Sequence, residues 1–308
     1  MTRSPKQWPR WSPAGQRIGT QSAAAESDPR QLVRAHFTAE ATYWEDVYQN
    51  TGVAALIYQQ RRQIALAWAD RLALPTGAPV LELGCGAGLT AVALAERGLC
   101  VTAVDVSEAM LARTRRRAAD AGVRNRLRVQ LGDAQALGFA DQTFELVIAL
   151  GLLLWLQEVG RSLEEIARVL RPGGYLILTV DNRQRIDYFL DPLHNIPLRS
   201  LKYRLKAVLR RLGLWHRPEP LRPHLHTAAE AAMLVRAAGL EPLADMPLGF
   251  GPFTLFGRPV LPQRIGVPLH RLLQLLAERG ALSLRELSGQ YVVLARKPVL
   301  ERLPARDT

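Results

Sequence analysis

The chain has 308 residues, of which 48% are hydrophobic and 22% are charged, and its formal net charge is +12. This composition is ordinary for a globular protein built from one large domain, or from one domain and a smaller appendage. The two cysteines, Cys85 and Cys100, exclude a disulfide scaffold and a four-cysteine zinc site, whereas the basic charge favours nucleic acid, anionic lipid or another acidic partner without choosing among them.

Residues 1–30 are rich in Ser, Pro, Ala and Gly, and we expect them to form a disordered tail. They contain no apolar segment typical of a secretory signal, and the longest apolar run, residues 146–156, is too short to span a bilayer. The cytoplasm is therefore the expected location.

Over residues 31–75, apolar and aromatic residues recur at helical spacing, which predicts an N-terminal helical cap.

Residues 76–181 alternate short apolar strands with helices and are expected to form a cofactor-binding core. The pattern predicts strands over 80–83, 100–104, 127–131, 144–149 and 175–180, and helices over 90–97, 107–121 and 163–170. Ser107 is of the residue type that caps a helix N-terminus. This alternation indicates parallel βαβ units, so the expected fold class is α/β with a doubly wound, mostly parallel sheet.

Beyond residue 181 the regular alternation breaks. Residues 182–226 are expected to form a basic helical insertion, and residues 227–297 the remainder of the core. Within that remainder the pattern predicts a helix over 227–238, strands over 240–246 and 290–295, and a lid-like insertion over 250–288. Residues 298–308 are expected to form a second tail.

Residues 198–217 of the basic insertion contain many Arg and Lys residues, no acidic residue, and leucines at helical spacing. Such an amphipathic basic helix is typical of a segment on an anionic membrane surface. It is equally typical of a lid that packs its apolar face on the core, and the lid is favoured here. Nucleic acid is disfavoured as a partner because aromatic residues are not interleaved with the basic ones.

The stretch ELGCGAGLT, residues 82–90, follows the first strand and places Gly84, Gly86 and Gly88 at alternate positions. A dinucleotide fingerprint would need a glycine where Leu89 stands, and a Walker loop would need a following Gly-Lys-Ser or Gly-Lys-Thr, so both interpretations fail. Three acids stand near the ends of the first three strands: Glu82, Asp105 and Asp133. A carboxylate at the end of the second strand can accept both hydroxyls of a ribose.

The glycine loop with these acids resembles the first motif of the class I S-adenosylmethionine-dependent methyltransferases. VTAVDVSEAML, GDAQAL and LRPGGYLIL resemble later motifs of that family, and the likeness covers about residues 78–181. It is closest to the small-molecule branch, which includes quinone and sterol methyltransferases. The resemblance implies a seven-stranded sheet whose last strand is antiparallel, and S-adenosylmethionine (SAM) as the cofactor.

The resemblance also implies a role for each matching residue. Gly84, Gly86 and Gly88 would line the methionine and ribose part of SAM, and Asp105 would bind the ribose hydroxyls. The other implied contacts are Val106 or Met110 beside the adenine, Asp133 and Ala134 at its amine, Glu82 at the glycine loop and the ammonium, and Ala149 and Leu150 beside the methionine moiety.

After the fourth strand the chain reads ALGLLLWLQE, without the Asn/Asp-Pro-Pro-aromatic stretch of methyltransferases that act on adenine or glutamine. The leucines and Trp155 indicate either an apolar wall or buried core. A catalytic base is therefore expected from the insertions, where His194, His224 and His226 are the candidates. The His-x-His pair has no clear third ligand, so no metal site is predicted.

The sequence thus predicts a SAM-dependent methyltransferase that acts on a small apolar or amphiphilic acceptor, with histidine-assisted O-methylation preferred over C- or N-methylation. One alternative is a membrane-surface enzyme that methylates a lipid or quinone and makes peripheral contact with the membrane through residues 198–217. The other is a non-catalytic protein that only binds the cofactor.

Overall fold

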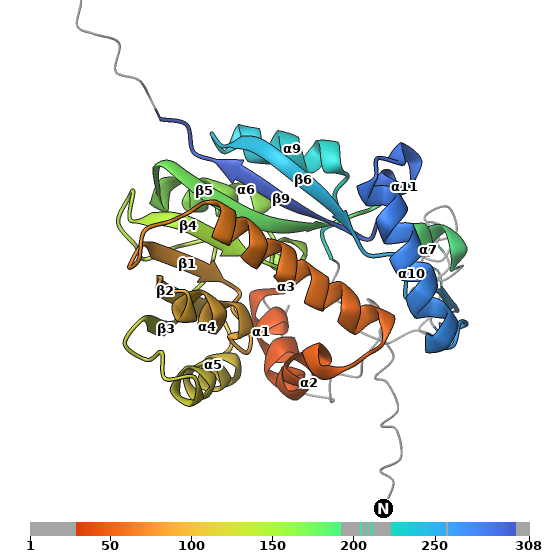
Figure 1. Ribbon diagram of the computed structural model, residues 1–308, viewed down its shortest axis with the longest axis horizontal. Helices are drawn as coiled ribbons and strands as arrows, with labels where there is room; N and C mark the ends of the chain where they lie inside the picture. The colour runs from red at the N-terminus through yellow and green to blue at the C-terminus, as the bar shows by residue number, and fades with distance from the viewer. Residues whose placement is uncertain are drawn as a thin grey trace, which may run out of the picture.

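The computed structural model describes residues 29–191, 223–256 and 258–299, together with the isolated positions 204, 208 and 211. At its centre is a seven-stranded sheet with the order β3-β2-β1-β4-β5-β9-β6 (Figure 1). Its strands are β1 (Pro79–Leu83), β2 (Cys100–Asp105), β3 (Leu127–Leu131), β4 (Phe144–Ala149), β5 (Leu170–Asp181), β6 (Glu241–Leu248) and β9 (Gln290–Arg296). β1 to β5 pair in parallel, whereas β9 runs antiparallel to both β5 and β6. The predicted doubly wound sheet with an antiparallel last strand is therefore confirmed.

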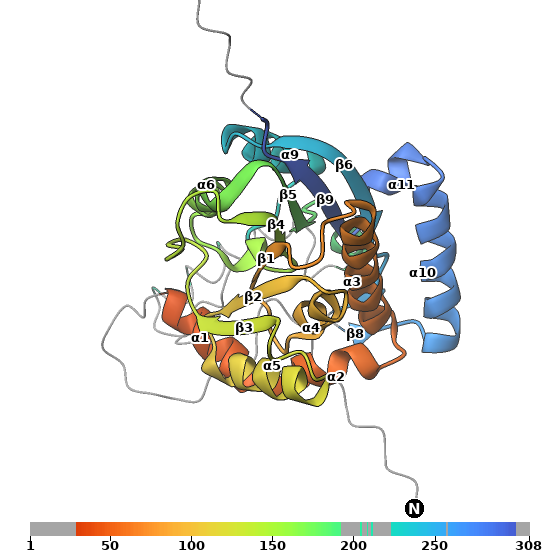
Figure 2. The same ribbon diagram turned by 60° about the vertical axis from the view of Figure 1, so that its left-hand side comes forward.

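Helices cover both faces of this sheet, which is why its central strands are apolar throughout rather than alternating. One face carries α3 (Val53–Arg71), α4 (Leu89–Glu96) and α5 (Glu108–Asp120), and the other carries α6 (Val159–Val169) and α9 (Ala228–Ala237) (Figure 2). Successive residues of β1 point to opposite faces of the sheet. Val80 packs in the core under α3 and α4, and Leu81 packs in the core under α6.

Two expected boundaries near the fifth strand are wrong. The helix expected over 163–170 begins four residues earlier, at Val159, and the strand expected over 175–180 begins at Leu170. Phe144 pairs with Leu170, and the register then shifts before Leu146 pairs with Tyr175. The turn-forming Pro172-Gly173-Gly174 stretch is thus a bulge inside one strand rather than a link before it.

The N-terminal part of the described chain forms α1 (Pro29–Ala39), α2 (Ala41–Asp46), the short helix η1 (Val47–Gln49) and α3. α1 lies beside the start of α5, where the hydroxyl groups of Thr38 and Ser107 are 3.0 Å apart. Ser107 occupies the N-cap position of α5 as expected, but its side chain makes no capping bond. The serine hydroxyl instead joins the N-terminal helices to the core.

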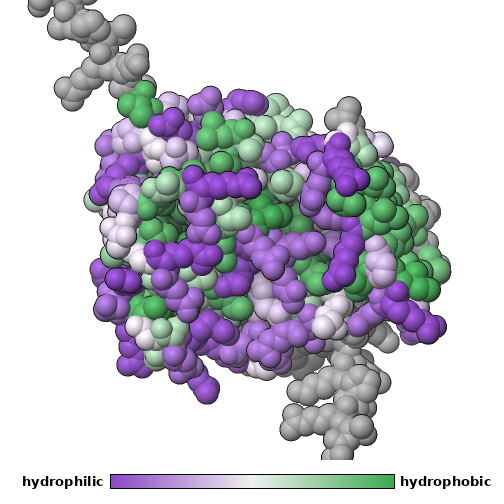
Figure 3. Space-filling model, viewed as in Figure 1, coloured by the Kyte–Doolittle hydropathy of each residue, from purple (hydrophilic) through white to green (hydrophobic). Residues whose placement is uncertain are grey.

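The C-terminal insertion contains β7 (Thr254–Leu255), β8 (Arg258–Pro259), α10 (Gln263–Glu278) and α11 (Leu282–Glu286), while α7 (Ile186–Leu190) follows β5 and η2 (Leu153–Trp155) follows β4. α10 is fixed to the core by the buried His270, whose ring nitrogen lies 3.0 Å from Gln60 Oε1 on α3. Apolar side chains on the outer side of α10 stay exposed, and green atoms gather over this helix in Figure 3.

Residues 198–217 lie outside the described residues except for Arg204, Val208 and Arg211. No helix in the described ranges has the length and apolar character needed to cross a bilayer.

Candidate active site

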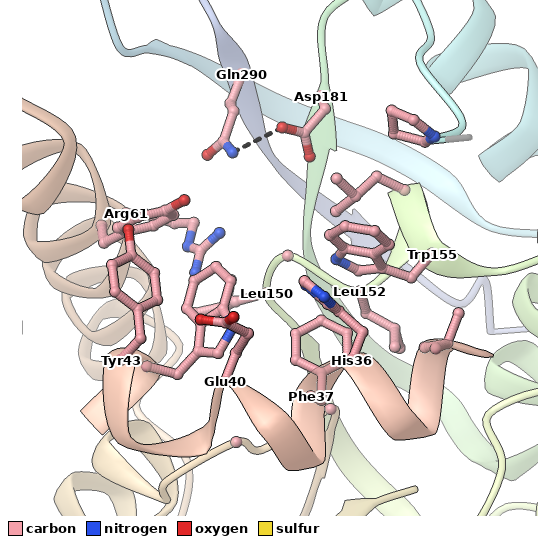
Figure 4. Close-up of a pocket in the computed structure, with 18 of the residues that line it drawn as sticks. His36, Phe37, Glu40, Tyr43, Arg61, Leu150, Leu152, Trp155, Asp181 and Gln290 are labelled. Carbon is pink, nitrogen blue, oxygen red and sulfur yellow. Dashed lines mark hydrogen bonds between the residues drawn. The ribbon is translucent and has the colours of Figure 1, made fainter. Parts of the chain in front are cut away.

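A cavity of about 1070 Å³ opens at the carboxyl edge of the parallel strands. Residues at or just after the ends of β1, β2, β4 and β5 form one side of it, namely Leu83, Asp105, Leu150 and Asp181. Helix α1 crosses the opposite side and presents His36 and Phe37 to the cavity, and Glu40 follows directly after it, as Figure 4 shows. Ligands of open parallel sheets bind at this edge, so the cavity is the candidate active site.

The glycine loop enters the cavity directly after β1. Gly84, Gly86 and Gly88 have φ values of 67°, 53° and 77°, a left-handed conformation that other residues adopt only with strain. The loop is held by the backbone of the neighbouring strand, because the amides of Gly84 and Cys85 both donate to the Val104 carbonyl, at 2.8 and 3.1 Å. Thr114 Oγ1 on α5 also donates to the Gly86 carbonyl at 2.8 Å. These hydrogen bonds therefore fix the conformation of the glycine loop.

Asp105, the last residue of β2, binds this loop from the side. Its Oδ2 accepts from the Gly86 amide and its Oδ1 from the Ser107 amide, both at 2.9 Å. Burial raises the pKa of the Asp105 carboxyl, and the hydrogen bonds from Ser107 and Gly86 oppose that rise. Each carboxylate oxygen retains further lone pairs, so Asp105 can accept hydrogen bonds from a ligand in the cavity as well.

Glu82 lies beneath the loop and is only 4% exposed. Its Oε2 atom is buried and has no hydrogen-bond partner. Burial raises the pKa of Glu82 to about 8, against the opposing effect of the Arg62 guanidinium. A buried acceptor that no protein group satisfies, on the wall of a cavity, indicates a ligand that carries a donor or a positive charge.

The far end of the cavity lies beside β2 and β3. Val106 and Met110 line it from the start of α5, and Asp133 and Ala134 line it from the loop after β3. Asp133 Oδ1 accepts from the Gln135 amide at 2.9 Å, and its Oδ2 pairs with Arg30 on α1 at 3.4 Å. The structure thus brings together, along one wall, most of the residues that the sequence assigned to the cofactor.

Two of those residues do not line the cavity. Gly88 begins α4 from the N-cap position, and a Cβ atom there would stand 2.6 Å from Cγ2 of Thr114. Ala149 is completely buried at the end of β4, whereas Leu150 lines the cavity. Both residues therefore lie behind the residues that line the cavity.

The histidines expected as bases lie elsewhere. His194 falls outside the described residues. The strip 223–226 runs beside the end of β5, where the His226 amide donates to the Asp181 carbonyl at 3.0 Å. Pro223 and Leu225 line the cavity, whereas His224 and His226 alternate with them and do not. His224 and His226 therefore face away from the cavity in this structure, because an extended strip turns alternate side chains to opposite sides.

Among the described residues, the histidine that lines the cavity is His36, which belongs to the segment expected as a helical cap. Its ring packs against Trp155, with ring centroids 5.5 Å apart, and burial lowers the pKa of the His36 imidazole. Leu152, Leu154 and Trp155 line the same part of the cavity and form an apolar wall, whereas Leu153 is buried in the core. Helical spacing in residues 31–75 predicted α1, but no motif marked which side of it meets a ligand.

Arg61 on α3 is a second residue that the sequence did not single out. It is 6% exposed, its Nη2 donates to Tyr48 Oη at 3.3 Å, and its guanidinium lies 4.9 Å from the centroid of the Tyr58 ring. A Cβ on Gly151 would stand 2.6 Å from Nη1 of Arg61, so the guanidinium packs directly on the backbone after Leu150. Arg61 Nε has no partner. The cavity therefore carries a buried cation beside its apolar wall.

Known proteins resemble this chain in sequence and in fold. Residues 81–178 match the family described as a methyltransferase domain. Methyltransferase GfsG of Streptomyces halstedii is 32% identical over 151 residues, which are 48% of this chain and 53% of that protein. The ubiquinone biosynthesis O-methyltransferase of Pseudomonas entomophila is 29% identical over 187 residues, which are 61% of this chain and 75% of that protein. The chain spans about half the length of the first of these relatives.

Solved structures share the fold. The magnesium protoporphyrin IX methyltransferase of Synechocystis PCC 6803, solved with bound SAH, superposes with a TM-score of 0.58 at 17% sequence identity. That superposition covers 88% of this chain and 100% of the other. At such low identity the likeness concerns the fold alone. It extends the match beyond residues 81–178 to most of the chain.

Proposed function

Residues 81–178 are a methyltransferase domain of the class I fold, and from this premise we propose that the protein transfers a methyl group from SAM to a small apolar or amphiphilic acceptor. The observation that carries the proposal is the meeting of Glu82, Asp105 and Asp133 with the glycine loop on one cavity. SAM supplies a methyl group already activated on a sulfonium, so the chain has to bind the donor, exclude water and align an acceptor.

The adenosine half of SAM fits the end of the cavity beside β2 and β3. Asp105 accepts the ribose hydroxyls there, and Val106 and Met110 provide apolar contacts for the adenine. Asp133 and the backbone of Ala134 face the adenine amine. The Arg30 guanidinium, which pairs with Asp133, holds that carboxylate in place from α1.

The methionine half fits the space above the glycine loop. The unpartnered Oε2 of Glu82 lies where the ammonium of SAM would be received, directly or through water. The Arg61 guanidinium, packed on Gly151 next to Leu150, is a cation available to the SAM carboxylate. The two ends of the amino-acid part of SAM thus meet groups of opposite charge on the same wall.

The rest of the cavity is suited to an apolar acceptor. Phe37, Trp44 and Trp155 form a connected aromatic wall, with ring centroids 5.9 Å apart for Phe37 and Trp44 and 5.4 Å apart for Phe37 and Trp155. His36 lies on this wall and is kept neutral by its lowered pKa, so it is the base for a hydroxyl acceptor. O-methylation is favoured because one of the relatives named above is an O-methyltransferase.

A membrane-bound acceptor is a second form of this proposal. Its motivation is the basic, amphipathic sequence of residues 198–217, which would bring the enzyme to an anionic lipid surface. Sedimentation of the purified protein with vesicles of anionic and of neutral phospholipid at low salt tests it. Binding only to the anionic vesicles would support the membrane form, and no binding to either would leave the acceptor as a dissolved molecule.

The test of the function is product formation. The protein is incubated with methyl-labelled SAM and a fractionated metabolite extract, and label is followed into new compounds by mass spectrometry. An Asp105→Ala protein handled identically serves as the control, because it retains the acceptor side of the cavity but loses the ribose contact. Label that enters a compound only with the wild-type protein supports the proposal, whereas consumption of SAM by neither protein would overturn it.

A further inference from the structure

The acceptor side of the cavity ends in a buried polar pair. Asp181 is the last residue of β5 and Gln290 is the first residue of β9, and the two are partners in the antiparallel register. Gln290 Nε2 donates to Asp181 Oδ1 at 2.8 Å, and Figure 4 shows this bond at the top of the cavity. Asp181 and Gln290 are 6% and 8% exposed, and both line the cavity.

Two of the four polar side-chain atoms of this pair have no hydrogen-bond partner. Asp181 Oδ2 and Gln290 Oε1 are both buried without a partner. Because the amide NH₂ of Gln290 faces Asp181 Oδ1, the carbonyl oxygen of Gln290 has to face elsewhere. In Figure 4 the second oxygen of Asp181 points into the cavity, toward Trp155. The pair therefore presents two unsatisfied oxygen atoms at one end of the cavity.

The two neighbouring arginines, Arg185 and Arg61, donate hydrogen bonds to groups other than Asp181. Arg185 Nε donates to Asp187 Oδ1 at 2.7 Å, and its guanidinium lies 5.2 Å from the centroid of the Tyr188 ring. Arg61 donates to Tyr48 and packs on Gly151. Burial raises the pKa of Asp181 and the charges of Arg185 and Arg61 oppose that rise, but neither arginine donates a hydrogen bond to Asp181 Oδ2. Buried acceptors are rarely left in this state, so the pair indicates a ligand group that donates.

We propose that Asp181 Oδ2 and Gln290 Oε1 anchor hydroxyl or amine groups of the acceptor, and so select acceptors that carry such donors on an aromatic or polycyclic body. The proposal rests on the proposed function, because it assigns the part of the cavity that SAM does not fill. Phe37, Trp155 and Leu152 contact the apolar body of the acceptor, while the polar pair fixes its orientation toward the methyl group. The two acceptors disfavour a molecule whose matching group is an ether or a carboxylate.

A naphthalenediol and its dimethyl ether are suitable probes, because they share one ring system and differ in donors. Binding of each probe to the wild-type protein is measured by calorimetry in the presence of saturating S-adenosylhomocysteine. The wild-type protein is expected to bind the diol about tenfold or more tightly than the ether, as for a hydrogen bond to a charged group. Equal affinities for the two probes, or no binding of either, would overturn the anchor.

Asp181→Asn is the main variant, since an asparagine can keep the bond from Gln290 and then turns an NH₂ donor into the cavity. It is expected to lose most of the preference for the diol while it binds S-adenosylhomocysteine normally. Gln290→Met, of similar length, removes one acceptor and is expected to lose part of the preference. Asp245→Asn makes the same chemical change on β6, at a carboxylate paired with Arg285 outside the cavity, and serves as the control.

The outcomes separate the two proposals. A wild-type protein that binds S-adenosylhomocysteine but does not distinguish the probes contradicts the anchor alone. An Asp181→Asn protein that loses S-adenosylhomocysteine binding places Asp181 in the donor site and also contradicts the anchor. A wild-type protein that does not bind S-adenosylhomocysteine contradicts the proposed function, and the ratio of diol to ether affinity is then measured without it. If Asp181→Asn does not fold, the wild-type ratio and Gln290→Met still decide.

Discussion

The backbone amide of Gly86 donates to Oδ2 of Asp105 at 2.9 Å, so the glycine loop and the carboxylate proposed to bind the ribose form one unit. Asp105 holds the loop with one oxygen and the start of α5 with the other. A carboxylate fixed by two backbone amides requires no rearrangement when a diol binds. The spacing between the two motifs in the sequence is thereby explained by a direct contact.

The first prediction concerns the fit of the glycine loop. Gly88→Ala should destabilise the protein by roughly 2–5 kcal/mol, because the residue has a φ of 77° and its new Cβ would stand 2.6 Å from Cγ2 of Thr114. Thr114 would be pushed from its bond to the Gly86 carbonyl, so SAM binding should weaken as well. Urea unfolding and calorimetry measure the two effects.

Gly122→Ala is the matched control for this substitution. Its φ is 69°, but the space around a Cβ at that position is open. It should cost only the conformational strain, about 1–2 kcal/mol, and leave SAM binding unchanged. Equal losses of stability in the two variants would show that the contact with Thr114 is unimportant.

The second prediction concerns the proton on Glu82. Burial raises the pKa of Glu82 to about 8, so most of this carboxyl is protonated at neutral pH in the cofactor-free protein. An ammonium group placed beside Oε2 lowers that pKa, and SAM binding near pH 7 should therefore release a proton. Calorimetry in buffers with different ionisation enthalpies measures the release. Glu82→Gln should abolish it, and an unchanged release in this variant would contradict the assignment.

The same shift affects stability. The folded-state pKa of Glu82 lies above its ordinary value of 4.5, so the folded protein binds more protons than the unfolded chain between pH 4.5 and about 8. The contribution of this group to stability is full below pH 4.5 and is lost as the pH rises through 8. Glu82→Gln should flatten this part of the stability curve of the cofactor-free protein, which denaturant unfolding at several pH values would reveal.

The third prediction concerns His36. Burial lowers the pKa of its imidazole below 6.5, so the neutral, proton-accepting form persists into mildly acidic solution. The rate constant kcat/KM for a hydroxyl acceptor should stay level at neutral pH and fall only as the pH drops through that lowered pKa. His36→Gln should reduce kcat by about 10²–10⁴ and remove the acidic limb of the profile.

His224→Gln is the control for this experiment, because His224 is exposed and does not line the cavity. It should leave both the rate and its pH profile unchanged. A loss of rate in His224→Gln together with a normal rate in His36→Gln would return the base to the segment that the sequence originally favoured.

The sheet was predictable from the sequence because each strand and its helix carry a local signal. Strings of apolar residues, the glycine turn after β1 and acids at three strand ends are all visible within a few neighbouring positions. The donor half of the cavity was predictable for the same reason, since it is built from loops that directly follow strands. The family match over residues 81–178 confirms the resemblance on which these assignments depended.

The acceptor half could not be found in this way. Its wall combines His36 on α1, Asp181 at the end of β5 and Gln290 at the start of β9, which are far apart in the chain. Only the paired register of β5 and β9 and the crossing of α1 bring them together. The sequence indicated His224 and His226 as candidate bases, but the alternation of side chains in an extended strip turns them away from the cavity.

The most direct test of the central claim, that this cavity binds SAM on Asp105, is a calorimetric titration of the wild-type and Asp105→Ala proteins with SAM. Asp120→Ala, an exposed carboxylate at the end of α5, is the control. The account predicts one SAM per chain for the wild-type and control proteins, and an affinity weakened by on the order of 100-fold in Asp105→Ala, as for the loss of two charge-assisted hydrogen bonds. Near-normal affinity in Asp105→Ala, or no binding by the wild-type protein, would contradict it.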